Sequence, residues 1–153
     1  MRHRIALAPL LAALLAVPTA QAQPAAAGTP AALLGEWWTP GFGARVRVEP
    51  CGDAAVCGRI VWAWDETPPD IADKSPLVGR KVIDAMRAAD AGHWNSGRLY
   101  NPEDGRDYKG SLHLQSPTRL VVEGCALFIC KKQVWRRVDE ARCPPLDPTE
   151  ARR

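Results

Sequence analysis

The chain has 153 residues, of which 20 are Lys or Arg and 17 are Asp or Glu. This length allows one domain with a tail and excludes a multidomain enzyme. A formal charge of +3, with 46% apolar and 24% charged residues, is typical of a globular protein and excludes a polybasic nucleic-acid binder.

Residues 1–22 have the pattern of an export signal. A basic start over residues 1–4 precedes thirteen uncharged residues, 5–17, and Ala20-Gln21-Ala22 then forms the small-x-small pattern of a signal-peptidase site. The apolar run is shorter than the roughly twenty residues that span a bilayer. The sequence therefore predicts cleavage after Ala22, no membrane span or lipid anchor, and a mature protein that is periplasmic or secreted. A buried core helix is the alternative, which the basic start disfavours.

Both ends of the mature chain are expected to lie outside the main folded body. Residues 23–33 predict a flexible Ala/Pro-rich lead-in and then a short helical turn, which Thr29 can cap and Pro30 can start. Residues 139–153 contain three prolines among many charges and predict an extended tail. Residues 34–138 are then the folded domain, which is small enough to benefit from crosslinks.

Within the domain, apolar and polar residues alternate with a period of two, which indicates strands. Arg45 to Glu49 places Val46 and Val48 on one face, and the Asn101 to Gly105 segment is typical of a hairpin turn. About eight strands are expected, at residues 35–39, 45–49, 59–65, 78–83, 94–100, 108–114, 119–123 and 133–137.

One helix is also predicted in the middle of the domain. Asp84 can cap a helix over residues 85–91, and Gly92 can end it. Sequential short strands joined by hairpins favour an all-β fold: a small up-and-down antiparallel β-barrel with one short helix, because closure leaves no exposed edge. An open sandwich is the alternative.

The cysteines are expected to be structural in an exported chain. Cys51 and Cys57 lie at the ends of adjoining strands, and Cys125 and Cys130 lie in the same relation on a later hairpin. Both pairs can form disulfides, which leaves Cys143 as a free-thiol candidate, although spacing alone does not fix the connectivity. A redox or metal role is the alternative, but neither spacing is C-x-x-C.

Catalytic motifs are absent from the sequence. It contains no phosphate-binding Gly-rich loop, no nucleophile elbow and no H-E-x-x-H, so we expect no cofactor and no metal site. His113 alternates outward on its strand and is expected to face solvent. Glu36 and Asp65 each adjoin tryptophans, an environment that suits a general acid. They are the only support for a carboxylate-based enzyme, and strand-end surface charges are the simpler interpretation.

Aromatic residues suggest a ligand site inside the barrel. Alternation places Trp62 and Trp64 on one face of their strand, and a later strand places Trp94 and Tyr100 on one face. A small barrel either fills its interior with side chains or leaves a cavity for a ligand. The candidate ligand-binding residues are Trp62, Trp64, Trp94, Tyr100 and Tyr108, with Arg98 as an anchor for a carboxylate.

Residues at the two ends of the domain resemble those of lipocalin-like barrels. Gly35-Glu36-Trp37 is a G-x-W motif on the first strand, and Trp135-Arg136-Arg137 places arginines on the last. In lipocalins and related barrels a first-strand Trp stacks beneath a last-strand Arg. The resemblance therefore implies barrel closure by Trp37 with Arg136 or Arg137, through cation–π contact.

The run from Gly97 to Gly105 with Tyr108, together with Cys57-Gly58-Arg59-Ile60, resembles the motifs of a bacterial exported family called domain of unknown function 2147. Two departures are that residues 68–74 lack a D-x-x-N-P segment common in the family, and that Glu123 stands where many members have Arg. The resemblance implies an exported lipocalin-like barrel with no established activity. It rests on Gly35-Glu36-Trp37, Cys51-Gly52, Cys57-Gly58-Arg59-Ile60, Pro76-Leu77-Val78-Gly79, the run from Gly97 to Gly105, Tyr108, Gly124 and Trp135-Arg136-Arg137.

Three hypotheses for function follow. The first is binding of a small apolar or amphipathic ligand inside the barrel. The second is an envelope interaction or maintenance protein whose barrel is filled and which acts through its surface. The third is the carboxylate-based enzyme.

Overall fold

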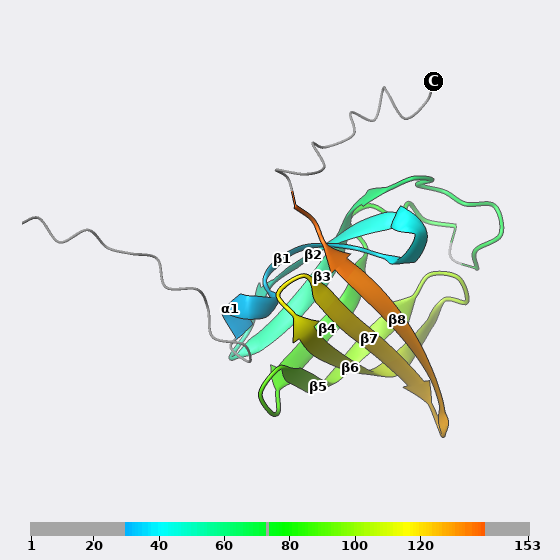
Figure 1. The fold of residues 1–153 in the computed structure, drawn as a ribbon. Helices are drawn as coiled ribbons and strands as arrows, with labels where there is room; N and C mark the ends of the chain where they lie inside the picture. Colours follow the sequence, from blue (N-terminus) through cyan, green and yellow to red (C-terminus); the bar gives the residue numbers. More distant parts are fainter. Residues whose placement is uncertain (1–29, 73, 140–153) are drawn as a thin grey trace, which may run out of the picture.

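Eight antiparallel strands close into a barrel in the computed structural model, which describes residues 30–72 and 74–139. Each strand pairs with its neighbours in the chain, and β1 pairs with β8 (Figure 1). The predicted all-β, up-and-down barrel is thereby confirmed. The elements are α1 (Pro30–Leu33), β1 (Gly35–Trp38), a 3₁₀ turn (Pro40–Phe42), β2 (Ala44–Cys51), β3 (Ala55–Ala63), β4 (Lys81–Ala88), β5 (His93–Asn101), β6 (Arg106–Ser116), β7 (Arg119–Ala126) and β8 (Ile129–Arg137).

The strands form where the sequence alternates, and their apolar side chains face inward. Val46 and Val48 of β2 are buried, as are Leu112 and Leu114 of β6. The residues between them point outward because successive side chains of a strand alternate between the two faces. The turn between β5 and β6 ends at Gly105, whose φ of 69° lies in the left-handed region that glycine tolerates.

The predicted helix over residues 85–91 is wrong, because residues 85–88 belong to β4 and residues 89–91 lie in the turn that follows it. Val82, Ile83 and Met86 are buried there. Ile83 and Met86 are three positions apart and both are buried. The alternation is interrupted between them at Ala85, which has a φ of 53°. Pairing with β3 and β5 on both sides outweighs the local helix preference of this alanine-rich segment. The α-helix of the described structure is α1, where the sequence predicts a helical turn.

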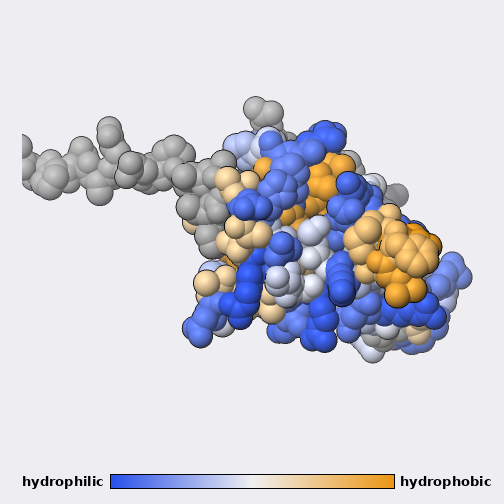
Figure 2. All heavy atoms as spheres, turned by 90° about the horizontal axis from the view of Figure 1, so that it is seen from below, coloured by the Kyte–Doolittle hydropathy of each residue, from blue (hydrophilic) through white to orange (hydrophobic). Residues whose placement is uncertain are grey.

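The up-and-down order gives the barrel two different ends. One end, which we call the α1 end, carries α1 and the β2–β3, β4–β5 and β6–β7 turns. Leu33 of α1 is fully buried, and its carbonyl accepts a 2.9 Å hydrogen bond from Trp37 Nε1. The opposite end carries the other four connections, including the β7–β8 hairpin. That hairpin ends in a hydrophobic cluster on a largely hydrophilic face (Figure 2).

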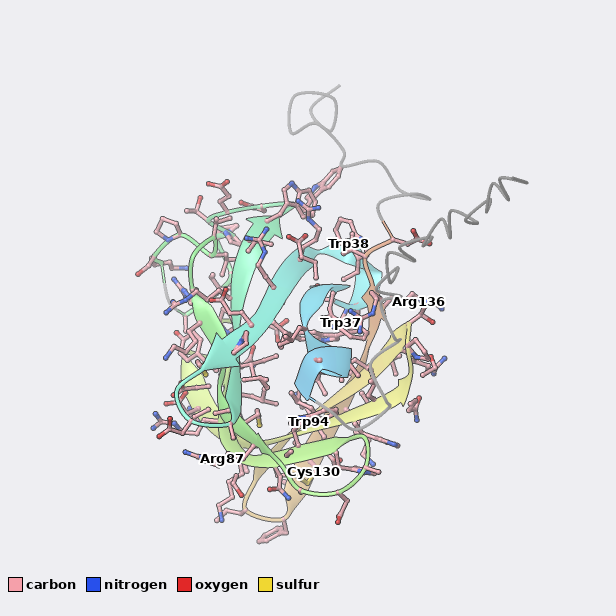
Figure 3. All side chains as sticks on the ribbon, turned by 90° about the vertical axis from the view of Figure 1, so that its left-hand side faces the viewer. Trp37, Trp38, Arg87, Trp94, Cys130 and Arg136 are labelled. Carbon is pink, nitrogen blue, oxygen red and sulfur yellow. A yellow bond between two sulfur atoms is a disulfide. The ribbon has the colours of Figure 1, made fainter. Side chains whose placement is uncertain are left out.

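Side chains of the barrel itself occupy the interior of the described domain. Trp37 and Trp94 are essentially inaccessible, and both lie within the ring of strands in Figure 3. The packing is close enough that a Cβ atom on Gly110 would overlap Met86 Cε and lie 2.8 Å from Leu99 Cγ. Glycine at position 110 leaves room for the Met86 and Leu99 side chains, which fill the space that a Cβ atom would take.

Several predictions fall on parts of the chain that the structure does not describe. They are the export signal over residues 1–22, most of the lead-in, and the tail with Cys143. None of the described helices is long and apolar enough to cross a membrane.

Candidate functional site

Two disulfides link adjoining strands. Cys51 and Cys57 bridge β2 and β3 with their Cα atoms 5.7 Å apart, and Cys125 and Cys130 bridge β7 and β8 with their Cα atoms 4.1 Å apart. Glu123 lies near the second pair and completes a group of three potential metal ligands. Because both thiols are consumed by the disulfide, that group offers a metal only one carboxylate.

Arg137 lies over the first-strand tryptophan at the seam between β1 and β8. Its Cζ is 4.1 Å from the centre of the Trp37 ring, and its guanidinium donates hydrogen bonds to the carbonyl oxygens of Leu34 (2.7 Å), Ala32 (2.5 Å) and Pro117 (2.5 Å). Burial lowers the pKa of Arg137. This one side chain therefore holds together α1, β1 and the β6–β7 turn. Arg136, the neighbouring residue, is exposed.

Trp62 and Trp64 do not line the interior as the sequence predicts. In the pairing of β2 with β3, Val46 faces Ile60 but Arg45 faces Trp62, so Val61 is one extra residue on β3. Such a β-bulge reverses the alternation beyond it. Ile60 therefore points inward and Trp62 outward, and Trp64, just past the end of β3, is 64% exposed.

A second bulge has the same effect on β5. Trp94 is buried in the core as predicted, but the register shifts between Trp94 and Gly97, with Ser96 at a φ of 60°. Beyond the bulge Leu99 is the inward residue. Arg98 is therefore on the outer surface, where it forms an ion pair with Asp84 at 3.1 Å, and it cannot anchor a ligand inside the barrel.

Tyr100 and Tyr108 occupy different sides of the sheet. Tyr100 follows the inward Leu99 and faces outward, where the Arg80 guanidinium lies 5.7 Å from its ring centre. Tyr108 shares the inner face of β6 with Gly110, at the end of the barrel opposite α1, and its hydroxyl donates to the Asp104 carboxylate. That hydrogen bond raises the pKa of Tyr108 and lowers the pKa of Asp104. Of the six candidates, Trp94 and Tyr108 alone face inward.

The displaced tryptophans form an aromatic cluster on the outside of β1–β3. The rings of Trp38 and Trp62 meet edge to face at 5.5 Å, those of Trp62 and Trp64 at 6.4 Å, and Arg45 lies 5.5 Å from the Trp38 ring. Nearby, the Glu36 carboxylate pairs with Arg45 at 3.4 Å and with Arg47 at 2.6 Å.

The two carboxylates considered for catalysis have separate structural contacts. Glu36 is held by its two arginines on the outer face, and the Asp65 carboxylate accepts a hydrogen bond from the Thr67 backbone N–H at 3.0 Å. These contacts account for the positions of both carboxylates, so neither position requires a catalytic role to explain it.

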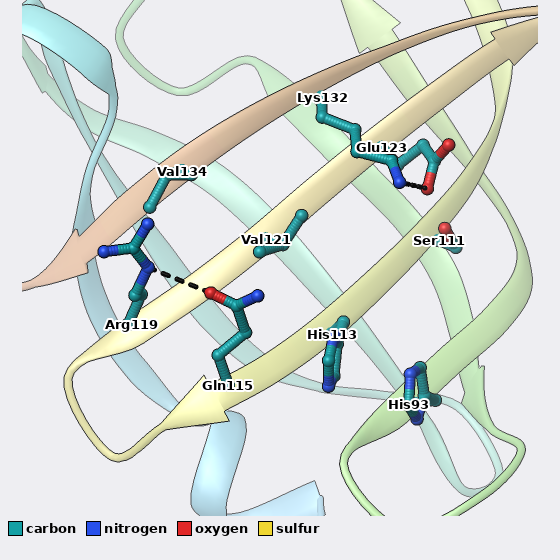
Figure 4. Close-up of a pocket in the computed structure, with 9 residues that line it drawn as sticks. All are labelled: His93, Ser111, His113, Gln115, Arg119, Val121, Glu123, Lys132 and Val134. Carbon is teal, nitrogen blue, oxygen red and sulfur yellow. Dashed lines mark hydrogen bonds and ion pairs between the residues drawn. The ribbon is translucent and has the colours of Figure 1, made fainter.

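A hollow with a volume of about 380 Å³ lies on the outer face of β5–β8 (Figure 4). We call it the outer hollow. Two cross-strand rows build it: His93–His113–Val121–Val134 and Ser111–Glu123–Lys132. Val121 lies in the middle of the group that lines it (Figure 4). Its lining residues are His93, Ser111, His113, Gln115, Arg119, Val121, Glu123, Lys132 and Val134.

The polar groups of the outer hollow are partly engaged with one another. The imidazoles of His93 and His113 stack with their centres 4.0 Å apart and an angle of 11° between their planes. Burial, and then the charge of His93, lowers the pKa of His113. Arg119 Nε donates to Gln115 Oε1 at 2.9 Å, and Lys132 pairs with Glu123 at 3.5 Å. The site therefore combines cationic and ionisable nitrogens with an apolar floor.

Sequence reasoning missed this site because its residues come from four strands. It correctly predicts that His113 faces outward, but it gives no reason to join His113 to His93, twenty positions earlier. The missing information is the strand register. The outward positions of neighbouring strands, once aligned, would have brought the two histidines together.

The sequence from residue 35 to residue 137 matches the family model described as "Uncharacterized protein conserved in bacteria (DUF2147)". The chain belongs to this family. Among curated proteins, none matches the sequence. The resemblance to this family, drawn from motifs between Gly35 and Arg137, is thus confirmed over the whole barrel.

One solved structure shares the fold. Protein HP1028 from Helicobacter pylori, described as belonging to the lipocalin family, superposes with a TM-score of 0.59 at 15% sequence identity. The match covers 72% of this chain and 85% of that one. The similarity shows that the barrel has a lipocalin-like fold.

Proposed function

We propose that this protein binds a small amphipathic anion in the outer hollow of β5–β8. The observation that carries the proposal is the combination of Arg119, Lys132 and two imidazoles around the apolar floor of Val121 and Val134. A carboxylate can pair with the guanidinium or the ammonium group, while an apolar ring or chain covers the valines.

The outer hollow accommodates such a ligand better than the barrel interior does. An apolar molecule inside the barrel would have to displace side chains such as Met86 and Trp94, which are fully buried and closely packed. The outer hollow needs no rearrangement of the core. Val134 is 37% exposed and loses this contact with water when a ligand covers it.

The histidine pair should make binding depend on pH. Both imidazoles lie beside the same space, and protonation of His113 adds positive charge to a site that already has Arg119 and a partly neutralised Lys132. An anion should therefore bind more tightly as the pH falls and His113 becomes protonated. A neutral ligand of the same shape should show no such gain.

The experiment compares 2-naphthoate with the isosteric 2-naphthamide by NMR titration of the imidazole and Val methyl signals. We expect naphthoate to shift the signals of His113 and Val121, and Arg119→Gln to weaken its binding on the order of tenfold. Arg47→Gln, on the opposite side of the barrel, is the matched control. Equal affinities for the two probes, or an unchanged affinity in Arg119→Gln, would contradict the proposal.

Binding inside the barrel predicts a different result. Dodecanoate entering the core would change the fluorescence of the buried Trp37 and Trp94 and leave the histidine signals unchanged. That outcome would place the ligand site inside the barrel and contradict binding in the outer hollow.

We also propose that the mature protein works outside the cytoplasm and begins at Gln23. The basic and apolar segments of residues 1–22 support this, and two disulfides suit an oxidising compartment. Intact mass measurement of the protein from the periplasmic fraction tests it. A chain that retains residues 1–22 and is recovered with free thiols in the cytoplasm would refute it.

A further inference from the structure

The tip of the β7–β8 hairpin exposes three consecutive apolar side chains. Leu127 is 95% exposed, Phe128 is 88% exposed and Ile129 is 65% exposed. Folding normally leaves such side chains exposed one at a time, so a continuous group of three is unusual. In Figure 1 the hairpin extends beyond the neighbouring strands, and in Figure 2 a hydrophobic cluster stands out from hydrophilic surroundings at that end.

The tip is fixed to the barrel by a covalent link at its base. The Cys125–Cys130 disulfide joins the two strands directly behind the apolar residues. Leu127 has a φ of 55°, the left-handed conformation of a tight hairpin turn. The exposed side chains are therefore presented by a short, crosslinked turn, which loses little entropy when it binds.

Lysines surround the hairpin just behind the tip. Lys131 and Lys132 follow Ile129, and Lys109 of β6 lies beside Cys125. Alternation places Lys131 on the face that continues the barrel interior, and it places Lys132 and Lys109 on the opposite face. Two acidic residues share that outer face: Glu123 pairs with Lys132, and Asp107 lies two positions before Lys109 on β6.

We propose that this tip inserts into the interface of an anionic lipid bilayer and attaches the barrel peripherally to a membrane. Lys131 is two residues from Ile129, roughly 7 Å along the strand. An interfacial apolar group sinks on the order of 5–10 Å below the headgroups. The lysine ammonium groups then lie at the level of the lipid phosphates while Leu127 and Phe128 contact acyl chains.

The distribution of charge favours a lipid surface over a protein partner. A protein interface covers one face of a hairpin and places complementary groups on that face. Here the positive charges lie on both faces, and the apolar residues occupy the end between them. A bilayer surrounds an inserted tip on all sides, and its anionic headgroups can reach lysines on either face. The inference concerns a different part of the barrel from the outer hollow and does not depend on ligand binding.

Vesicle flotation tests the proposal with the mature full-length protein. The probes are vesicles of phosphatidylcholine alone and vesicles of equal parts phosphatidylcholine and phosphatidylglycerol. We expect binding to the anionic vesicles, a loss on the order of tenfold in Phe128→Ser, and a loss of about fivefold in Lys131→Gln. Val78→Ser, another exposed apolar position, and Arg87→Gln, at the α1 end, are matched controls that should bind as the wild type does.

A second measurement places the tip in the membrane. Phe128→Trp introduces an indole whose fluorescence should be quenched by brominated acyl chains in the anionic vesicles. No flotation of the wild type, or equal flotation of Phe128→Ser, would overturn the proposal. It would also be overturned if vesicles did not bind and sedimentation showed a dimer that Phe128→Ser abolishes, because the tip would then cover a second copy of the chain.

Discussion

Replacing Arg137 by alanine should destabilise the barrel far more than replacing the adjacent Arg136. The guanidinium of Arg137 satisfies the carbonyls of Ala32, Leu34 and Pro117 and stacks on Trp37, whereas Arg136 is exposed on the same strand. The carbonyls of Ala32 and Leu34 are partly buried and cost about 1 kcal/mol each when left without a donor, whereas the Pro117 carbonyl is exposed and can bond to water instead. The cation–π contact adds about 1 kcal/mol.

The expected loss for Arg137→Ala is therefore about 3 kcal/mol, against less than about 0.5 kcal/mol for Arg136→Ala. Urea denaturation followed by tryptophan fluorescence measures both values, and the thermal midpoint should fall by about 10 °C or more for Arg137→Ala. Arg137→Lys, which keeps a charge but offers one donor group, should lie between the two. Equal losses for the two alanine variants would refute the assignment of the closure to Arg137.

Three other predictions concern the core, the hairpin crosslink and pH. Gly110→Ala should cost about 2 kcal/mol in urea denaturation because its Cβ would overlap Met86 Cε. Gly110→Ala combined with Met86→Ala should lose less stability than the sum of the two single losses, and additive losses would contradict the overlap. Cys125→Ala with Cys130→Ala should lower stability by about 2 kcal/mol without changing the circular dichroism of the barrel; unchanged stability would mean that the crosslink is dispensable. Burial, the larger cause, holds the pKa of His113 below its unfolded value of 6.5, so the unfolded chain binds more protons as the pH falls. Stability should therefore be complete above about pH 6.5 and decline below it, and His113→Gln should flatten this part of the curve measured by thermal denaturation.

The candidate site shows where alternation along a strand no longer predicts which side chains face inward. Alternation correctly places His113 outward and Leu112 inward, because both follow the regular part of β6. It fails at Trp62 and Arg98, which lie beyond the bulges in β3 and β5. One extra residue in a strand reverses every later side chain, and a single sequence carries no clear sign of it.

The sequence by itself determined most of the strands, the inward side chains of the regular strands, the pairs of cysteines and the family to which the chain belongs. These features depend on local alternation, on turn residues and on motifs that are contiguous in the chain. The tertiary structure alone decided that residues 85–88 are strand, that Trp62 of β3 faces outward, and that His93 stacks on His113. Each of these depends on which residues face each other across neighbouring strands, and that pairing is set by the closure of the whole barrel.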